Sequence, residues 1–163
     1  MKDTKTTPQT QQKKAKASSD SNQKVAVVLV RGFVGLNFKV RQTLKLLRLH
    51  AKNNCVVIEN TPITKGMLQK VKDFVTWGEI DDATFKTLVD KRGEEFLGRT
   101  TDSKGKYTYN TFFELNKKNY KKTFKLSPPR KGFGRKGIKT PFKLGGALGY
   151  RGADMKSLLE RMM

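Results

Sequence analysis

Apolar residues change their spacing along the chain, and the first change predicts a strand followed by a helix. Residues 25–30 form a continuous apolar run rich in valine, typical of a central strand that is covered on at least one face. From Asn37, which suits an N-cap, to about His50, apolar positions recur at helical spacing. The sequence therefore predicts one strand and one amphipathic helix within its first 50 residues.

The same alternation repeats twice. Residues 55–58 predict a second strand, and Thr61-Pro62 favours a helix start because Pro fits the first helical position. Residues 75–78 predict a third strand, and the acidic pair at 81–82 suits the cap of a third helix that ends near residue 92. The order β-α-β-α-β-α predicts an α/β (α+β) fold, a two-layer sandwich in which helices cover a sheet.

The last third of the chain has no long periodic segment. Residues 112–115 favour a short strand, whereas Pro128-Pro129 and three glycines interrupt residues 117–143, which predicts an extended loop. Residues 154–162 carry four apolar side chains on one helical face and predict a short amphipathic C-terminal helix.

Charge divides the chain into three segments. The formal net charge is +21, from 35 Lys and Arg against 14 Asp and Glu. Residues 1–23, a polar and basic tail expected to be disordered, carry +3; residues 24–98, the expected compact core, carry +5; residues 99–163, the expected basic extension, carry +13. Such a field attracts polyanions, above all nucleic acid, with an anionic membrane surface as the other obvious partner.

The run from Arg130 to Gly137 is the most informative local motif. Its glycines let the backbone approach phosphates closely, its Arg and Lys neutralise them, and Phe133 is suited to stack on an unpaired base. The surrounding residues 117–143 contain eleven basic residues and no acid. A solvated basic linker is the alternative, but RNA contact explains the concentration of charge better.

Two motif matches in this run fail on context. Gly132-x-Gly134-x-x-Gly137 fits the dinucleotide-binding fingerprint, but prolines precede it and Pro141 blocks the helix that should follow. Residues 131–134 also fit the opening of the RNP1 motif, which should continue with alternating aromatic residues on a strand. The sequence therefore predicts neither a Rossmann site nor an RNA-recognition motif.

Four cations repeat at helical spacing beside the apolar stripe of the first predicted helix: Arg41, Lys45, Arg48 and Lys52. This basic face is either a phosphate contact or only a solvated surface. Arg31, at the end of the first strand, is a further candidate.

The sequence offers little support for catalysis. His50, the only histidine, sits at a predicted helix C-terminus, where it interacts favourably with the helix dipole. Cys55, the only cysteine, is interpreted as a small core residue in a strand. One cysteine forms no internal disulfide, and one histidine does not suggest a transition-metal site. We expect no enzyme activity, no cofactor, no small-molecule substrate, no secretory signal and no membrane span, and therefore a cytoplasmic protein.

The middle of the chain resembles the large-subunit ribosomal protein family called L thirty in prokaryotes and L seven in eukaryotes. The resemblance rests on residues 28–32, residues 41–49 and above all residues 60–71, Asn-Thr-Pro-Ile-Thr-Lys-Gly-Met-Leu-Gln-Lys-Val. Residues 127–132 and 144–149 resemble the long archaeal and eukaryotic members, and the form of residues 143–149 suggests the archaeal branch.

The resemblance implies a β-α-β-α-β core similar to a ferredoxin-like fold, bound as a monomer to large-subunit ribosomal RNA beside neighbouring ribosomal proteins. It also implies RNA contacts at Arg31, Arg41, Lys45 and Lys65. Family members often carry Arg at the position of Lys65, and Lys keeps the charge but lacks the planar fork of Arg. The full set of candidate RNA-binding residues is Arg31, Arg41, Lys45, Arg48, Lys52, Lys65, Lys117, Lys118, Lys121, Lys122, Lys125, Arg130, Lys131, Gly132, Phe133, Gly134, Arg135, Lys136, Lys139, Lys143 and Arg151.

Two other classes of function remain open from the sequence. A subunit of an RNA-processing enzyme would need clustered acids or a histidine pair, which the sequence does not clearly offer. A free RNA chaperone or regulator would use the same basic surfaces as a ribosomal protein.

Overall fold

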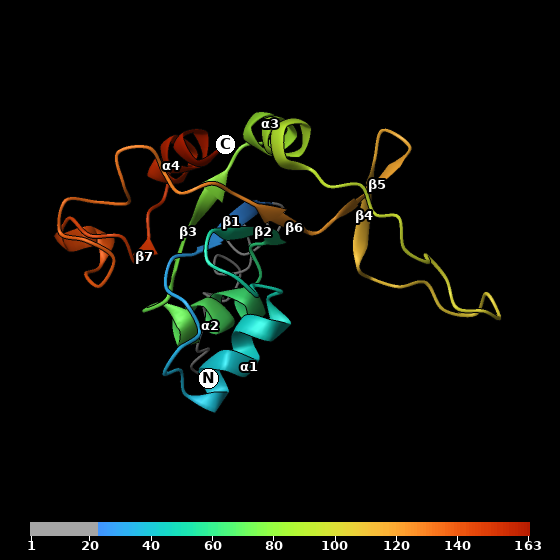
Figure 1. Cartoon of the computed structure of the whole chain (residues 1–163), viewed down its shortest axis with the longest axis horizontal. Helices are drawn as coiled ribbons and strands as arrows, with labels where there is room; N and C mark the ends of the chain where they lie inside the picture. The colour runs from blue at the N-terminus through green and yellow to red at the C-terminus, as the bar shows by residue number, and fades with distance from the viewer. Residues whose placement is uncertain (1–22) are drawn as a thin grey trace, which may run out of the picture.

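A mixed five-stranded sheet lies at the centre of the computed structural model, which describes residues 23–163 (Figure 1). The strand order is β6-β2-β1-β3-β7, and β4 and β5 form a separate hairpin. The elements are β1 (Lys24–Leu29), α1 (Phe38–Leu46), β2 (Asn54–Glu59), α2 (Pro62–Val71), β3 (Val75–Ile80), α3 (Asp82–Arg92), β4 (Phe112–Leu115), β5 (Lys118–Lys121), β6 (Thr123–Lys125), β7 (Gly149–Tyr150) and α4 (Asp154–Met162), with a 3-10 turn at Phe142–Leu144.

Strand β1 occupies the middle of the sheet. It pairs antiparallel with β2 on one side and β3 on the other, so that Val27 lies between Val56 and Trp77. The short outer strands differ in direction, because β6 is antiparallel to β2 and β7 is parallel to β3. The α/β class predicted from the sequence is confirmed.

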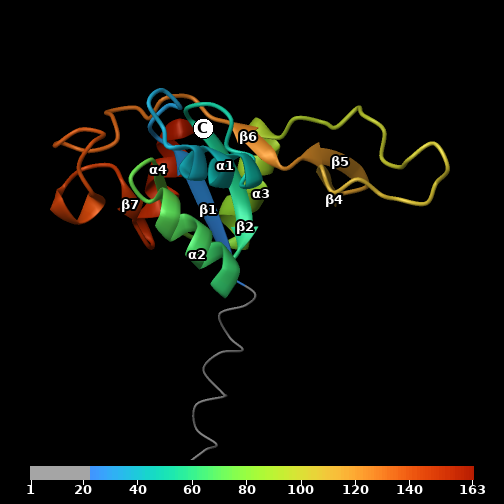
Figure 2. The ribbon, with the colours of Figure 1, turned by 90° about the horizontal axis from the view of Figure 1, so that it is seen from below.

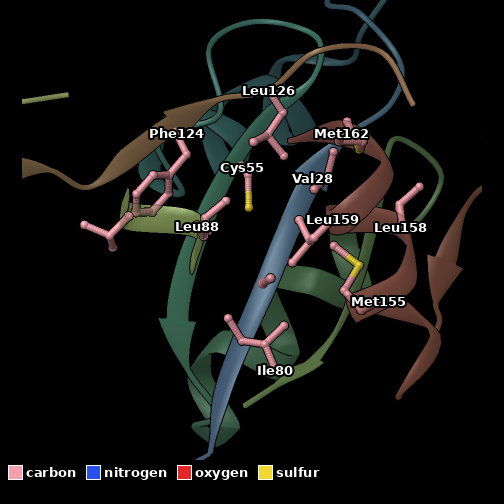
Figure 3. Packing of buried hydrophobic residues seen from close by; sticks show 12 residues of the cluster. Val28, Cys55, Ile80, Leu88, Phe124, Leu126, Met155, Leu158, Leu159 and Met162 are labelled. Carbon is pink, nitrogen blue, oxygen red and sulfur yellow. The ribbon is translucent and has the colours of Figure 1, made fainter. Parts of the chain in front are cut away.

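Helices cover both faces of this sheet. Val25, Val27 and Leu29 pack with residues of α1 and α2, whereas Ala26 and Val28 pack with residues of α3 and α4. Figure 1 shows the two helix pairs on opposite sides, and Figure 3 shows side chains of α4 directed over β1. The prediction of two layers was therefore wrong. A strand that is apolar at every position requires cover on both faces, and α4 supplies part of the second cover.

The predicted helix starts are confirmed at α1 and α2. The Asn37 side chain accepts a hydrogen bond from the Lys39 N–H at 3.2 Å. Thr61 and Thr64 form a reciprocal capping box ahead of α2. At α3 the Asp81 side chain makes no capping bond, and Asp82 instead accepts a 2.6 Å hydrogen bond from Lys24.

Helix α1 ends earlier than predicted, at Leu46 instead of near residue 50. Arg48 adopts a left-handed φ of 59°, and its N–H donates to the Lys45 carbonyl while the Leu49 N–H donates to the Leu44 carbonyl. These two bonds form a Schellman motif, in which the buried side chains of Leu44 and Leu49 lie in the same core cluster. The apolar sequence continues through this turn, so the hydrophobic pattern did not reveal the helix end.

The C-terminal third completes the core that the sequence assigned to residues 24–98. Within the predicted loop 117–143, residues 118–121 form β5 and residues 123–125 form β6, so an extended loop was wrong for this part. Phe124 is fully buried (Figure 3). Helix α4 has the predicted bounds and lies so close to β3 that a Cβ at Gly78 would come within 2.7 Å of the Met155 Cβ.

Residues 97–121, which we call the arm, project from the body of the molecule and contain the β4–β5 hairpin (Figures 1 and 2). Its tight turn places Asn116 and Lys117 at φ values of 52° and 63°, which suits the right-handed twist of a hairpin. At its base, Phe112 stacks on Phe96 with ring centroids 5.3 Å apart, and Phe113 lies 5.7 Å from Phe85. Aromatic contacts thus fix the arm to the body.

Candidate nucleic-acid interface

Residues 130–137, which we call the glycine loop, lie at the end of the molecule opposite the arm (Figures 1 and 2), and their cations are exposed. Three of its residues have left-handed φ angles, namely Lys131 at 65°, Gly132 at 74° and Gly137 at 82°. The exposed cations in and directly after this loop are Arg130, Lys131, Arg135, Lys136, Lys139 and Lys143. They form the largest concentration of exposed positive charge among the predicted site residues.

The glycine loop is held by the body of the protein. The Arg130 N–H donates to the Arg161 carbonyl of α4 at 3.1 Å, and the Arg161 guanidinium donates back to the Gly132 carbonyl at 3.2 Å. Gly134 packs on the backbone of Gly146, where a Cβ would lie 2.6 Å from the carbonyl oxygen. The cations therefore project from a backbone with defined anchors, which lowers the entropic cost of binding.

Phe133 does not present its ring as predicted. The ring is partly buried against Val30, Ala147 and Leu148. The backbone carbonyl of Phe133 accepts a 2.8 Å hydrogen bond from Arg151. We therefore interpret Phe133 as the apolar anchor of the glycine loop instead of a platform for a base. The sequence did not reveal this, because the residues it contacts lie more than ten positions away in the chain.

The structure brings Arg31 and Lys52 together next to the end of the glycine loop. A shallow pocket of about 230 Å³ is lined by Arg31, Gly32, Lys52, Phe74 and Ile138, among others. The Arg31 guanidinium stacks on the Phe74 ring at 4.9 Å and donates to the Asp73 carbonyl. The result is one basic surface built from three separate segments.

The predicted basic face of the first helix is divided by the early end of α1. Arg41 and Lys45 are exposed on α1, and Lys65 is exposed in the first turn of α2. Lys52 instead lies by Gly32, and Arg48 turns toward the arm, where it donates to the Asn110 carbonyl. The prediction that these four cations share one helical face, which rested on their regular spacing, was therefore wrong.

Three predicted cations of the 117–143 segment are paired with acids. Lys118 contacts Glu95 at 2.8 Å, while Lys121 and Lys125 contact Glu94 at 2.8 and 2.9 Å. Hydrogen bonds from these two lysines hold the pKa of Glu94 below its usual value, and Glu95 raises the pKa of Lys118. Both acids lie outside residues 117–143. Counting charges within that segment alone therefore overstated the number of unpaired cations. Lys117 is exposed in the hairpin turn.

Arg151 has a structural place in the interior. It is 7% exposed, and its guanidinium donates to Thr76 Oγ1 at 2.9 Å, to the Phe133 carbonyl at 2.8 Å and to the Ala147 carbonyl at 3.3 Å. It also stacks on the Phe142 ring at 4.4 Å. Burial lowers the pKa of this guanidinium. We therefore withdraw Arg151 from the set of RNA contacts.

The arm holds candidate residues that the sequence reasoning missed. Tyr107 is 71% exposed, Tyr109 is also exposed, and Arg99, Lys104 and Lys106 lie close by in the chain. Exposed aromatic rings among cations are suited to stacking on unpaired bases. The alternation Lys104-x-Lys106-Tyr107-x-Tyr109 was the available signal in the sequence.

No arrangement suited to metal or nucleophilic chemistry is found in residues 23–163. No group of three His, Cys, Asp or Glu side chains in that part of the chain is placed to hold a metal ion. Burial raises the pKa of the Cys55 thiol to about 12, so it stays protonated and unreactive. Nor is any helix in this range long and apolar enough to cross a bilayer.

Comparison with known proteins agrees with this basic, non-catalytic surface. The family model of Ribosomal protein L30p/L7e matches residues 25–75. The large ribosomal subunit protein uL30 of Methanococcus vannielii is 41% identical over 151 residues, which cover 85% of this chain and 98% of that protein. The uL30 proteins of Methanopyrus kandleri and Nanoarchaeum equitans are 42% and 41% identical, over 82% and 83% of this chain and 100% and 96% of their own lengths.

Fold, surface and similarity together define a ribosomal protein of the L30p/L7e class, which is not enzymatic. Within that class, the chain belongs to the family of the large ribosomal subunit protein uL30. The resemblance drawn from residues 28–32, 41–49 and 60–71 is thereby confirmed, as is the absence of an enzymatic role.

Proposed function

We propose that this chain is a structural protein of the large ribosomal subunit in the cytoplasm, where it binds ribosomal RNA as a single copy beside other ribosomal proteins. The observation that carries the proposal is the glycine loop, which presents Arg130, Lys131, Arg135 and Lys136 outward from a backbone anchored to α4. Phosphate contacts with release of counterions are the interaction for which such a surface is suited.

The fold serves this function by holding basic segments at both ends of the folded body. Hydrogen bonds to α4 hold the glycine loop, and the aromatic contacts of Phe112 and Phe113 hold the arm (Figures 1 and 2). The ferredoxin-like description of the core and an RNA-binding role for the arm and the glycine loop within residues 99–163 belong to the same proposal. The residues that we retain as RNA contacts are Arg31, Arg41, Lys45, Lys52, Lys65, Lys117, Arg130, Lys131, Gly132, Gly134, Arg135, Lys136, Lys139 and Lys143, to which we add Tyr107 and Tyr109.

Two triple variants with the same change in net charge test the proposal. The first carries Lys131→Gln, Arg135→Gln and Lys136→Gln in the glycine loop; the second carries Lys118→Gln, Lys121→Gln and Lys125→Gln at the lysines paired with Glu94 and Glu95. Binding of the full chain to large-subunit ribosomal RNA is measured across a salt series. The first variant is expected to lower the slope of log affinity against log salt by about 2–3, since each lost phosphate contact removes roughly 0.7–0.9.

The matched variant separates local contact from net charge. Equal losses in both variants would show that the total charge decides, and the assignment of the glycine loop would then be wrong. A free RNA chaperone is excluded if a tagged copy sediments with the large subunit at about one copy per particle and survives a moderate salt wash. Release at modest salt would favour the chaperone instead.

A further inference from the structure

A shallow pocket of about 230 Å³ lies where the loop after β1 meets the segment that follows the glycine loop. It is lined by Arg31, Gly32, Val34, Lys52, Phe74 and Ile138. Val34 is 99% exposed, the highest fraction among the large apolar side chains of residues 23–163, and Ile138 is 42% exposed. Single apolar side chains at a surface are ordinary, but these two come from distant parts of the chain and line one pocket beside two cations.

The loop that carries Val34 is anchored on both sides of that residue. Leu36 is buried in the core cluster that β1 shares with α1 and α2, and Phe33 packs against the same cluster. Gly35 lies between them and Val34 in a turn with a φ of 72°. Val34 is therefore presented to solvent by neighbours whose side chains are fixed in the core.

Arg31 is held in position at the pocket. Its guanidinium stacks on the Phe74 ring at 4.9 Å, and its Nη1 donates to the Asp73 carbonyl at 3.2 Å. Its backbone N–H donates to the Phe74 carbonyl at 3.1 Å. Within residues 23–163, no protein group accepts a hydrogen bond from its Nε or Nη2, so these donors are available to a ligand.

The second cation is placed by a turn at the start of β2. The N–H of Asn53 donates to the Leu29 carbonyl at 2.8 Å, which fixes the backbone next to Lys52. The Lys52 side chain crosses Gly32, where a Cβ would lie 2.8 Å from the lysine Cε. No carboxylate of residues 23–163 forms an ion pair with Arg31 or Lys52. The pocket thus combines apolar surface with two cations that lack an acidic partner.

An unpaired nucleotide has the chemistry that matches this combination. Its base is flat and has apolar faces, and its phosphates are anionic. RNA-binding proteins commonly hold bases that have left the stack against apolar or guanidinium surfaces. A pocket of 230 Å³ is smaller than the roughly 300–1,000 Å³ that encloses a drug-sized ligand, so it suits one base and not a larger group.

Two other occupants match the pocket less well. The bases of a paired RNA helix stay stacked inside the duplex, so its phosphates would meet the cations and leave the apolar surface uncovered. An acidic peptide also matches two cations. However, exposed Arg135, Lys136 and Lys139 continue the positive charge away from the pocket, and a continuous basic surface favours a polyanion.

We propose that this pocket receives the base of one unpaired nucleotide of large-subunit RNA, which lies against Val34 and Ile138 while its phosphates contact Arg31 and Lys52. The inference rests on the proposed function and adds the class of RNA element, a nucleotide extruded from a loop or bulge. The glycine loop contacts the neighbouring backbone phosphates, so the two sites bind one continuous stretch of RNA.

Photocrosslinking from two sides of the pocket tests the assignment in intact large subunits. Val34 and Ile138 are replaced, one at a time, by the photoreactive residue p-azidophenylalanine. Leu46 serves as the control because it is 70% exposed and does not line the pocket. The adducts are mapped by mass spectrometry and reverse transcription. The Val34 and Ile138 probes are expected to label the same unpaired nucleotide, and the Leu46 probe is not.

Substitutions at Val34 give a second measurement without a bulky probe. Val34→Asp is expected to lower the affinity of the full chain for large-subunit ribosomal RNA at least about fivefold, the lower end for loss of one stacked base. Val34→Ile keeps the apolar contact and should bind within about twofold of the parent chain. Leu46→Asp makes the same charge change outside the pocket and should also have little effect. Because Val34 is exposed, the thermal midpoint should stay unchanged.

Several results would overturn the inference: a protein adduct, an adduct to a paired nucleotide, different nucleotides for the two probes, no RNA adduct above the Leu46 control, or equal losses of affinity in Val34→Asp and Leu46→Asp. Incorporation of the parent chain and its affinity for the RNA are measured first. Their failure would contradict the proposed function itself. Normal incorporation and affinity with no shared nucleotide at Val34 and Ile138 would contradict only the pocket.

Discussion

The Nε atom of Arg151 donates a hydrogen bond to Oγ1 of Thr76 across 2.9 Å, although the two residues lie 75 positions apart in the chain. Both side chains are buried, and Thr76 in turn donates to the Gly149 carbonyl at 3.1 Å. This contact joins β3 to the segment that carries β7 and the glycine loop. It converts a basic residue of the C-terminal third into a structural cross-link.

Replacement of that guanidinium should affect stability. Arg151→Ala leaves Thr76 Oγ1 and the carbonyls of Phe133 and Ala147 without this donor, and we expect the free energy of unfolding to fall by about 3 kcal/mol. Urea denaturation of the full chain measures the change. Arg135→Ala, an exposed loop cation, should change stability by less than about 0.5 kcal/mol. Weakened RNA binding at unchanged stability in Arg151→Ala would return Arg151 to the interface.

The exposed tyrosines of the arm should contribute to RNA affinity without supporting the fold. Base stacking is worth about 1–3 kcal/mol per base, so Tyr107→Ala should weaken binding to large-subunit RNA roughly five- to hundredfold. Tyr107→Phe keeps the ring and should bind almost as the parent chain does. Equal affinities for Tyr107→Ala and the parent protein would show that this ring meets no base. The thermal midpoint should be unchanged in both variants.

The ion pairs of Glu94 should add stability that depends on pH. The pKa of Glu94 lies below the usual 4.5, so the stabilisation is present above pH 4.5 and is lost as the pH falls through the lower folded-state pKa. Glu94→Gln should lower the free energy of unfolding at pH 7 by about 0.5–1 kcal/mol, as for surface pairs, and this difference should vanish in acid. Glu160→Gln on α4 makes the same charge change and should show no comparable loss. A constant difference at every pH would argue against the ion pairs.

The Cys55 thiol should report on opening of the sheet. Its pKa of about 12 and complete burial predict negligible reaction with a disulfide reagent at pH 8 while the chain is folded. Rising urea should bring the reaction rate up in parallel with unfolding, since Cys55 is the only cysteine. The native state holds the proton to about pH 12 and the unfolded thiol loses it near pH 9.0. The free energy of unfolding should therefore fall above pH 9 by more than it does in Cys55→Ala. Fast labelling of the native protein would contradict the buried position.

Local features were predictable where their cause is local. The starts of α1 and α2 and both ends of α4 follow from caps, from Thr61-Pro62 and from apolar spacing, and the structure confirms them. The end of α1 was missed because the helix stops at a left-handed turn at Arg48. Glycine, and occasionally Asn or Asp, favours that conformation, and arginine does not.

Features that depend on distant partners could not be derived in this way. The three residues of β6 form a strand only because they pair with the edge of β2 around Cys55. Nothing within residues 123–125 indicates that partner. The pairing of Lys121 and Lys125 likewise depends on Glu94, which lies 27 positions before Lys121. Composition shows where basic residues are concentrated along the chain, but it could not distinguish paired cations from those that face solvent.

The place of α4 in the core has a consequence for the order of events during synthesis. Met155, Leu158, Leu159 and Met162 cover the face of β1 that carries Ala26 and Val28, yet they are made more than 120 residues later. A nascent chain that has reached only residue 98 contains β1 to β3 and α3, but it lacks the part of the cover on that face that α4 supplies. Such contacts between distant parts of a chain form slowly, and exposed apolar surface of this kind promotes aggregation. Early binding of a chaperone to that face would protect the chain until α4 emerges.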